Sequence, residues 1–319
     1  MPISATLNGS GATFPKGFYE VAIQEYKAVQ PDVTVNYAGG GSGTGRQNLQ
    51  DGVVDFAGSD AIVKPEDKPK YKGDILYFPT VAAPITVAYN LPDIETLILD
   101  ADTVAKIFLR QIKKWNNPVI ANLNPGVKLP GTAITVAHRS DGSGTTENFT
   151  KYLSAAAPGV WTGKSGATVE WPADTQAGNG NQGVAQIVKT TAGAVGYVDL
   201  SDATASRLQV AALRNEAGEV VAPTLEAATA AVATAVIAPD LTYNPINADG
   251  PDAYPITAPT WILVYENQPD KAKGEALKSF LRYLLGEGQK LAAFVDYAAL
   301  PSSLQQQAQA RVDSIVVAA

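Results

Sequence analysis

Glycine- and hydroxyl-rich turns that follow short strand patterns constrain the fold of this chain more than any other feature. Three such turns come early, at residues 9–14, 39–45 and 58–61, and the first two lead into helix patterns. A fourth, at residues 140–145, follows an alternating strand pattern and precedes a helix pattern that ends near Ala157. Strands that alternate with helices in this way predict an α/β fold, in which ligand sites gather at the carboxyl ends of strands.

The fourth turn has the residues expected of an anion site. A helix start carries unpaired N–H groups and partial positive charge. Here Ser143, Gly144 and Thr145 lie at the predicted start, and Arg139 adds a forked set of donors just before it. An ordinary helix with a Ser/Thr cap after a turn explains the same residues, so this stretch alone leaves both interpretations open.

Asp60, in the third turn, adds a carboxylate to the early turns. An ionised Asp only accepts hydrogen bonds, so beside an anion it repels unless the anion carries a proton. Phosphate keeps such a proton near neutral pH, because the relevant pKa of phosphate groups lies near 6, whereas sulfate has none. Asp60 therefore suits a phosphate site, although a plain turn residue at a strand end fits the pattern as well.

Composition excludes several functional classes. The 319 residues carry a net charge of −7, with a pI near 4.8, which disfavours general nucleic-acid binding. With no Cys and one His, thiol catalysis, disulfides and Cys/His zinc sites are excluded. No apolar run reaches membrane-spanning length, and the first residues lack the basic and apolar regions of a secretory signal. We expect that any export signal was trimmed from the chain.

Other glycine motifs fail on their context. Gly163-Lys164-Ser165 lacks the earlier glycine of a phosphate-binding NTPase loop, and the Gly-x-Gly-x-x-Gly at residues 178–183 follows no buried strand. Neither Ser42 nor Ser143 has the flanking glycines of a nucleophile elbow. His138 is the one base available to a Ser-His-Asp triad, and its place in a strand beside an Arg favours a structural role.

Taken together, the motifs are similar to those of the phosphate-binding proteins of bacterial phosphate ABC transporters. The resemblance covers nearly the whole chain, and the motifs occur in the same order. The segments that carry it are Gly9–Pro15, Gly40–Gly43, Asp55–Asp60, Arg139–Thr145, Gly193–Val198, Tyr254–Ile256 and Asp296–Pro301.

The resemblance implies a two-lobed α/β fold of the type II periplasmic-binding class, with a mixed sheet flanked by helices in each lobe and two hinge crossovers. Residues 1–82 and 259–319 would form lobe I, and residues 83–258 lobe II. Phosphate would bind in the cleft. Position by position, the implied phosphate ligands are Thr13, Phe14, Ser42, Asp60, Arg139, Ser143, Gly144 and Thr145. Asp141 would hold the Arg139 side chain, and no metal or cofactor is implied.

The same resemblance implies a function in transport without catalysis. Inorganic phosphate and a membrane permease would be the partners, nucleic acid would not, and the chain would be a monomer. The location would be periplasmic or extracellular. Some members of the family are lipoproteins at the cell surface, and the Cys that would carry the lipid is absent from this sequence. Two alternatives stay open at this stage: a phosphatase or esterase on the same scaffold, and a receptor for another oxyanion such as sulfate or molybdate.

Overall fold

The computed structural model describes residues 3–318 and groups them into two compact units. Unit 1 contains the residues up to Ala82, Val236–Asn244 and the residues from Pro259 onward. Unit 2 contains Ala83–Ala235 and Pro245–Ala258. The segment Val236–Asn244, which the predicted domain division puts with the middle of the chain, thus groups with the terminal segments. Its attachment is local to unit 1, because the Trp261 indole N–H donates to the Leu241 carbonyl at 3.0 Å.

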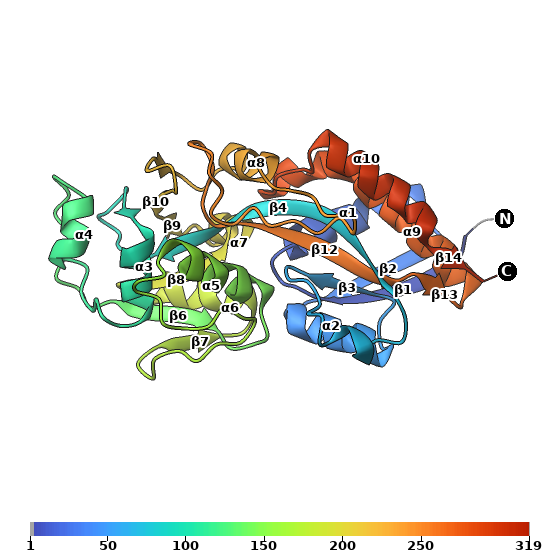
Figure 1. Cartoon of the computed structure of the whole chain (residues 1–319), viewed down its shortest axis with the longest axis horizontal. Helices are drawn as coiled ribbons and strands as arrows, with labels where there is room; N and C mark the ends of the chain where they lie inside the picture. The colour runs from blue at the N-terminus through green and yellow to red at the C-terminus, as the bar shows by residue number, and fades with distance from the viewer. Residues whose placement is uncertain (1–2, 319) are drawn as a thin grey trace. The chain divides into compact units, whose positions relative to one another are not determined.

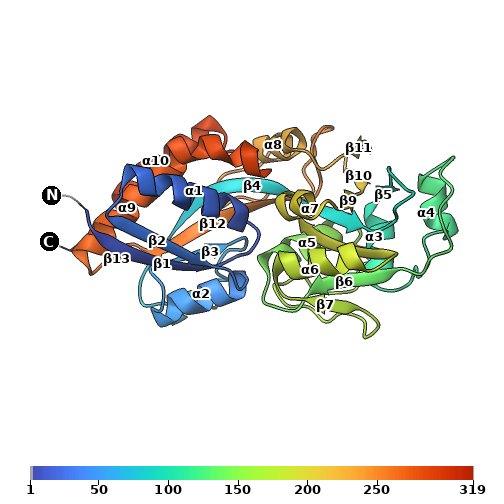
Figure 2. The ribbon, with the colours of Figure 1, turned by 180° about the vertical axis from the view of Figure 1, so that it is seen from behind.

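Unit 1 is built on the sheet β2-β1-β3-β12, in which β1 pairs parallel with β2 and β3, and β12 pairs antiparallel with β3. Figures 1 and 2 show α2 on one face of this sheet and α1 and α9 on the other. The elements are β1 (Ala5–Gly11), α1 (Lys16–Val29), β2 (Val33–Ala38), α2 (Ser42–Asp51), β3 (Phe56–Ser59), a 3-10 turn (Lys68–Lys70), β12 (Thr257–Tyr265), β13 (Asn267–Gln268), α9 (Lys271–Leu285), a 3-10 segment (Glu287–Val295), α10 (Ser302–Arg311), a 3-10 turn (Val312–Ser314) and β14 (Val316–Val317).

The helix α1 shows why this layer forms. Its buried residues Phe18, Tyr19, Ala22 and Tyr26 recur at spacings that place them on one face of a helix. Burial of each large apolar side chain contributes roughly 1.5–3 kcal/mol of transfer free energy, so this face holds the helix against the sheet. The expectation that a helix follows the turn at residues 9–14 is confirmed.

Unit 2 contains the strand order β4-β8-β6-β7, in which β4 is Ile75–Tyr89, β6 is parallel to β7 and β8, and β4 is antiparallel to β8. Its core gathers small and branched side chains of β8 and α6, including Val184, Val188 and Val198, all fully buried. The elements are β5 (Ile98–Leu99), α3 (Ala101–Phe108), α4 (Pro118–Leu123), β6 (Thr135–Arg139), α5 (Gly144–Ala156), β7 (Gln176–Gly178), α6 (Gly180–Thr190), β8 (Ala194–Asp199), α7 (Leu200–Ser206), β9 (Gln209–Val210), β10 (Ala212–Arg214), β11 (Val220–Val221) and α8 (Leu225–Ala233).

The strand β4 (Ile75–Tyr89) differs from its sequence-based description. Because Pro79 and Pro84 lie within it, the sequence predicts an extended segment that passes between two lobes, and not a central strand. The structure has one strand of 15 residues. The ladder with β8 begins at Ile85, directly after the second proline, so neither proline is required to donate to that ladder. β4 begins in unit 1 and ends in unit 2.

Candidate functional site

The turn after β1 lies at the carboxyl edge of the unit 1 sheet. Gly11 pairs with Gly58 of the parallel strand β3, so the residues just beyond them, Thr13–Phe14 and Asp60, leave the sheet at the same edge. The approach is close: a Cβ atom on Gly11 would lie 2.1 Å from the Gly58 carbonyl oxygen, and the φ of Gly11 is +138°. Only glycine fits there. The Phe14 carbonyl accepts from the Tyr297 hydroxyl at 2.6 Å, which fixes the turn.

Ser42 is the first residue of α2 and lies beside Asp60. Gly41 precedes it with φ +91°, and its N–H donates to the Gly11 carbonyl at 2.9 Å, which brings the start of α2 to the first turn. The Ser42 hydroxyl accepts from the Asp60 N–H at 3.1 Å and points toward its carboxylate Oδ2 at 3.4 Å. The structure therefore brings these two predicted site residues together.

Asp60 is nearly fully buried, at 2% exposure, and hydroxyl groups hold its carboxylate. The Thr260 hydroxyl donates to Oδ1 at 2.7 Å, and Ser42 lies at Oδ2. Both contacts come from neutral donors, which stabilise a charge without cancelling it. Sequence reasoning missed Thr260, because β12 lies 200 residues further along the chain.

Two buried tyrosines lie behind this carboxylate. Burial raises the pKa of Tyr19, and the nearby Asp60 charge adds to the rise, while a hydrogen bond with Thr80 opposes it. The pKa of Tyr37 is also raised by burial, then by Tyr19 and Asp60. Both phenols therefore stay protonated at neutral pH. The Tyr37 hydroxyl donates to the Ala12 carbonyl at 2.7 Å, which supports the first turn.

We call Thr13, Phe14, Ser42 and Asp60 the Asp60 group.

Arg139 ends β6 in unit 2, and its side chain is 1% exposed. Its guanidinium is held on two edges. Nε donates to Asp141 Oδ1 at 2.7 Å and one terminal nitrogen donates to Asp141 Oδ2, which makes a bidentate pair. The other terminal nitrogen donates to Asn181 Oδ1 at 2.7 Å and lies 3.5 Å from the Thr145 hydroxyl. A buried cation fixed in this way is a preformed donor set for an anion.

Asp141 is the counter-charge of Arg139. Burial acts to raise the pKa of Asp141, but the hydrogen bond and charge of Arg139, with the Gly180 N–H at 3.1 Å, hold that pKa below its ordinary value. Asp141 is thus ionised at neutral pH. The structure confirms the contact between Asp141 and Arg139.

The helix α5 begins at Gly144, next to Arg139. Ser143 is its N-cap and accepts from the Thr146 N–H at 3.0 Å. The first N–H groups of a helix have no partner within the helix, so Gly144 and Thr145 present N–H donors at this end. The sequence-based expectation of a helix start here is confirmed. We call Arg139, Asp141, Ser143, Gly144 and Thr145 the Arg139 group.

Asn181, fully buried on α6, is a member of this network that the sequence analysis missed. A signal was present in the rejected Gly-x-Gly-x-x-Gly. A Cβ atom on Gly178 would lie 2.5 Å from the Gly183 backbone, so these glycines let the end of β7 pack against α6. That packing places Asn181 beside Arg139. Asn181 in turn donates to Asp199, whose pKa is raised by burial and by the neighbouring Asp202.

His138 lies outside this network. One ring nitrogen contacts the Arg139 carbonyl at 2.9 Å and the other contacts the Thr175 hydroxyl at 3.1 Å. The ring stacks on Trp171, with centroids 5.1 Å apart. Burial lowers the pKa of His138, and the bond to the carbonyl opposes the shift. These contacts fit a structural residue and give no support to a phosphatase or esterase triad.

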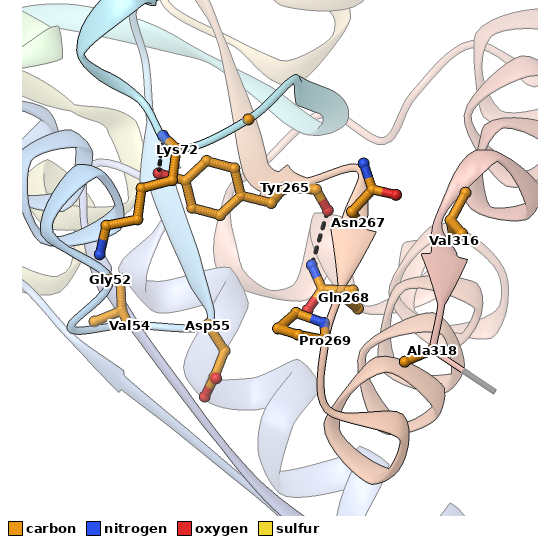
Figure 3. Close-up of a pocket in the computed structure, with 11 residues that line it drawn as sticks. Gly52, Val54, Asp55, Lys72, Tyr265, Asn267, Gln268, Pro269, Val316 and Ala318 are labelled. Atoms are coloured by element: carbon orange, nitrogen blue, oxygen red, sulfur yellow. Dashed lines mark hydrogen bonds between the residues drawn. The ribbon is translucent and has the colours of Figure 1, made fainter.

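A pocket of about 540 Å³ lies elsewhere in unit 1, between β14 and the loop after α2. Figure 3 shows its polar residues bonded to one another: the Lys72 N–H donates to the Tyr265 hydroxyl, and Gln268 donates to the Tyr265 carbonyl. Asp55, also on its wall, accepts from Lys273 at 2.9 Å. The lining includes no residue of the Asp60 group.

Clustered metal ligands or a membrane-spanning helix within residues 3–318 would indicate another class of function. Among these residues, no group of three or more His, Cys, Asp or Glu side chains could hold a metal ion. Over the same residues, the longest apolar helices fall short of what is needed to cross a membrane. The two groups described above contain one Arg with its counter-charge Asp141, hydroxyls, helix starts and the buried carboxylate of Asp60.

Comparison with known proteins identifies the family. A model of the PBP superfamily domain matches residues 2–287. The phosphate-binding protein PstS of Methanocaldococcus jannaschii is 41% identical, over 91% of this chain and 80% of that protein. PstS of Pasteurella multocida is 37% identical, over 96% and 89%. The chain therefore belongs to the PBP superfamily and, within it, to the family of phosphate-binding proteins named PstS.

Solved structures agree on the fold. A periplasmic phosphate-binding protein, PfluDING, solved with bound phosphate, matches with a TM-score of 0.79 over 96% of this chain and 93% of that one, at 21% identity. The predicted α/β fold of the type II periplasmic-binding class is thereby confirmed. The relatives are named as binding proteins, which agrees with the prediction that the chain is not an enzyme.

Proposed function

We propose that this protein binds inorganic phosphate outside the cytoplasm and delivers it to the membrane permease of an ABC transporter. The relatives at 33–41% identity are named phosphate-binding proteins, which supports the ligand. The observation that carries the proposal is the buried Arg139, fixed on two edges and adjacent to the start of α5.

In this proposal, the Arg139 group supplies positive potential and most of the donors. The guanidinium has five N–H donors, and the bonds to Asp141, Asn181 and Thr145 account for four of them. The Thr145 hydroxyl accepts from Arg139 and from Asn181, so its own hydrogen is directed away from both. Phosphate oxygens would take the remaining guanidinium N–H and the Thr145 hydroxyl hydrogen, together with the N–H groups of Gly144 and Thr145 and the hydroxyl of Ser143.

The Asp60 group would recognise the proton on phosphate. An ionised Asp60 accepts a hydrogen bond from P–OH, while Ser42, Thr13 and the backbone of Phe14 donate to the remaining oxygens. Sulfate, with no proton, would face the carboxylate as a like charge. The Thr260 and Ser42 hydroxyls that contact this carboxylate are neutral donors, so these two bonds would leave its charge available for the discrimination.

Binding by both groups to one anion would favour a conformation in which each can reach it. Such a ligand shifts the population of a hinged protein, since it gains contacts in one state that it lacks in the other. We infer that this state is the one the permease recognises, that the protein acts as a monomer, and that it lies in the periplasm or at the cell surface, with a lipid anchor where a native Cys supplies one.

Titration calorimetry at neutral pH, on protein freed of bound phosphate, tests the proposal. We expect one phosphate per chain and sulfate binding weaker by at least about 100-fold, since an uncompensated like charge in a buried site costs several kcal/mol. Equal affinity for the two anions would contradict the role of Asp60, and binding of neither would contradict the proposed function. Hydrolysis of a generic phosphomonoester, measured in parallel, should stay at background.

A further inference from the structure

The buried side-chain amide of Asn181 bonds to two members of the Arg139 group, the guanidinium of Arg139 and the hydroxyl of Thr145. Asn181 accepts from the Arg139 guanidinium through Oδ1 at 2.7 Å. Its Nδ2 lies 3.4 Å from the Thr145 hydroxyl, as a donor to that oxygen. Asn181 is fully buried, so water cannot replace these bonds without a structural change. One side chain therefore sets the direction of both a cation and a hydroxyl.

Asp199 contacts the Asn181 amide as well and bears on its orientation. Nδ2 of Asn181 donates to Oδ1 of Asp199 at 2.7 Å. If the amide were rotated by half a turn, its oxygen would face the Asp199 oxygen and its NH₂ would face the N–H groups of Arg139. The contact with Arg139 would then be repulsive, since guanidinium has donors only. The observed orientation, with Oδ1 toward Arg139 and Nδ2 toward Asp199 Oδ1, gives both neighbours a hydrogen bond.

Asp199 is itself held in place by the backbone. It is fully buried at the end of β8, and its Oδ2 accepts from the Asp202 N–H at 3.1 Å as the N-cap of α7. Because one carboxyl oxygen caps the helix, the other stays directed at Asn181. The chain of contacts thus runs from a helix start through Asp199 and Asn181 to Arg139.

We propose that Asn181, oriented by Asp199, is a positioning residue that sets the guanidinium of Arg139 and the hydroxyl of Thr145 for anion binding. The inference rests on the proposed phosphate-binding function and extends it to residues that need not touch the ligand. It explains why Asp141 alone does not complete the support: Asp141 holds one edge of the guanidinium, and Asn181 holds the terminal nitrogen on the other.

The variant Asn181→Ala tests this role by calorimetry with inorganic phosphate. Loss of one hydrogen bond to a buried charged group should weaken phosphate binding by about tenfold. Asn124→Ala is the matched control, since Asn124 is a buried asparagine in the same unit that bonds to backbone groups of Ile98 and Ile120. It should lose thermal stability and keep phosphate affinity within about twofold. Should Asn181→Ala not fold, Asn181→Ser removes the same reach and is expected to give the same loss.

A double-mutant cycle separates positioning from general damage. In an Arg139→Ala background there is no guanidinium to orient, so Asn181→Ala should change phosphate affinity by less than about threefold, the remainder acting through Thr145. Full additivity of the two losses would overturn the inference, as would unchanged affinity in Asn181→Ala. Wild-type protein that fails to bind phosphate would instead contradict the proposed function, so the two failures are distinguishable.

Discussion

The Asp60 group and the Arg139 group use the same local device and differ in charge. Each follows the end of a strand and includes the first residues of a helix, α2 in unit 1 and α5 in unit 2. In unit 2 the device surrounds a cation that is held by Asp141 and Asn181. In unit 1 it surrounds a carboxylate that is held by the hydroxyls of Ser42 and Thr260.

Because of this difference, attraction of an oxyanion and selection between oxyanions can be assigned to separate groups. Helix starts and an Arg attract any oxyanion, and so cannot distinguish phosphate from sulfate. A buried carboxylate supplies a penalty that only a protonated anion escapes. If the proposed function holds, removal of the cation should lower affinity for all oxyanions, and removal of the carboxylate should chiefly change their ratio.

The largest expected effect is that of Arg139→Ala. Loss of a buried charged donor should weaken phosphate binding by about 3 kcal/mol, or more than 100-fold, because Asp141 is then left without its counter-charge. Calorimetry measures the change. Arg110→Ala is the matched control, because Arg110 lies in the same unit and bonds to Asp174 and the Ile134 carbonyl. Equal affinity in wild type and Arg139→Ala would remove Arg139 from the site.

A smaller effect, on the ratio of the affinities for phosphate and sulfate, is expected of Asp60→Asn. Neutralising the carboxylate removes the repulsion of sulfate, so the phosphate-to-sulfate affinity ratio should fall by about 30-fold, which corresponds to about 2 kcal/mol. Competition between the two anions measures it. Asp55→Asn, in the same unit but bonded to Lys273 and the Asn8 N–H, should leave the ratio unchanged. A ratio that does not move in Asp60→Asn would show that selectivity lies elsewhere.

The smallest effect concerns stability and Asp141. Its pKa is lowered in the folded state, so it contributes stability at pH values above the unfolded pKa, near 3.9. That contribution is lost as pH falls through the lower folded pKa. Asp141→Asn should therefore lower the unfolding free energy by about 1.5 kcal/mol at pH 7, and the difference should shrink below about pH 4. Denaturant unfolding at several pH values tests this; a difference that grows on acidification would contradict it.

Local patterns predicted much of the site, because the groups are built from short segments. Gly11, the start of α2 and the cap Ser143 can each be read from a few neighbouring residues. The structure confirms the contact of Arg139 with Asp141, and it brings Ser42 into contact with Asp60. That the two groups bind one phosphate stays a prediction.

Residues brought in from far along the chain were not predicted. Thr260 and Asn181 act through partners 200 and 42 positions away, and no periodic pattern encodes such pairs. The Asn-, Pro- and Gly-rich run of residues 115–131 is typical of loops, yet the short helix α4 lies within it, capped by Asn117 and begun by Pro118; six residues are too few to show helical periodicity. The prolines in β4 argued against a central strand, but the ladder between β4 and β8 starts beyond them, so they do not interrupt it.

A crystal structure with phosphate bound would show whether the Asp60 group and the Arg139 group hold the same anion. We predict one phosphate whose oxygens lie within about 3 Å of both a carboxylate oxygen of Asp60 and a guanidinium nitrogen of Arg139. We also predict that the oxygen nearest Asp60 carries the proton, with the short spacing typical of an O–H donor to a carboxylate. A phosphate held by one group, with the charged side chain of the other beyond hydrogen-bond reach, would contradict the account.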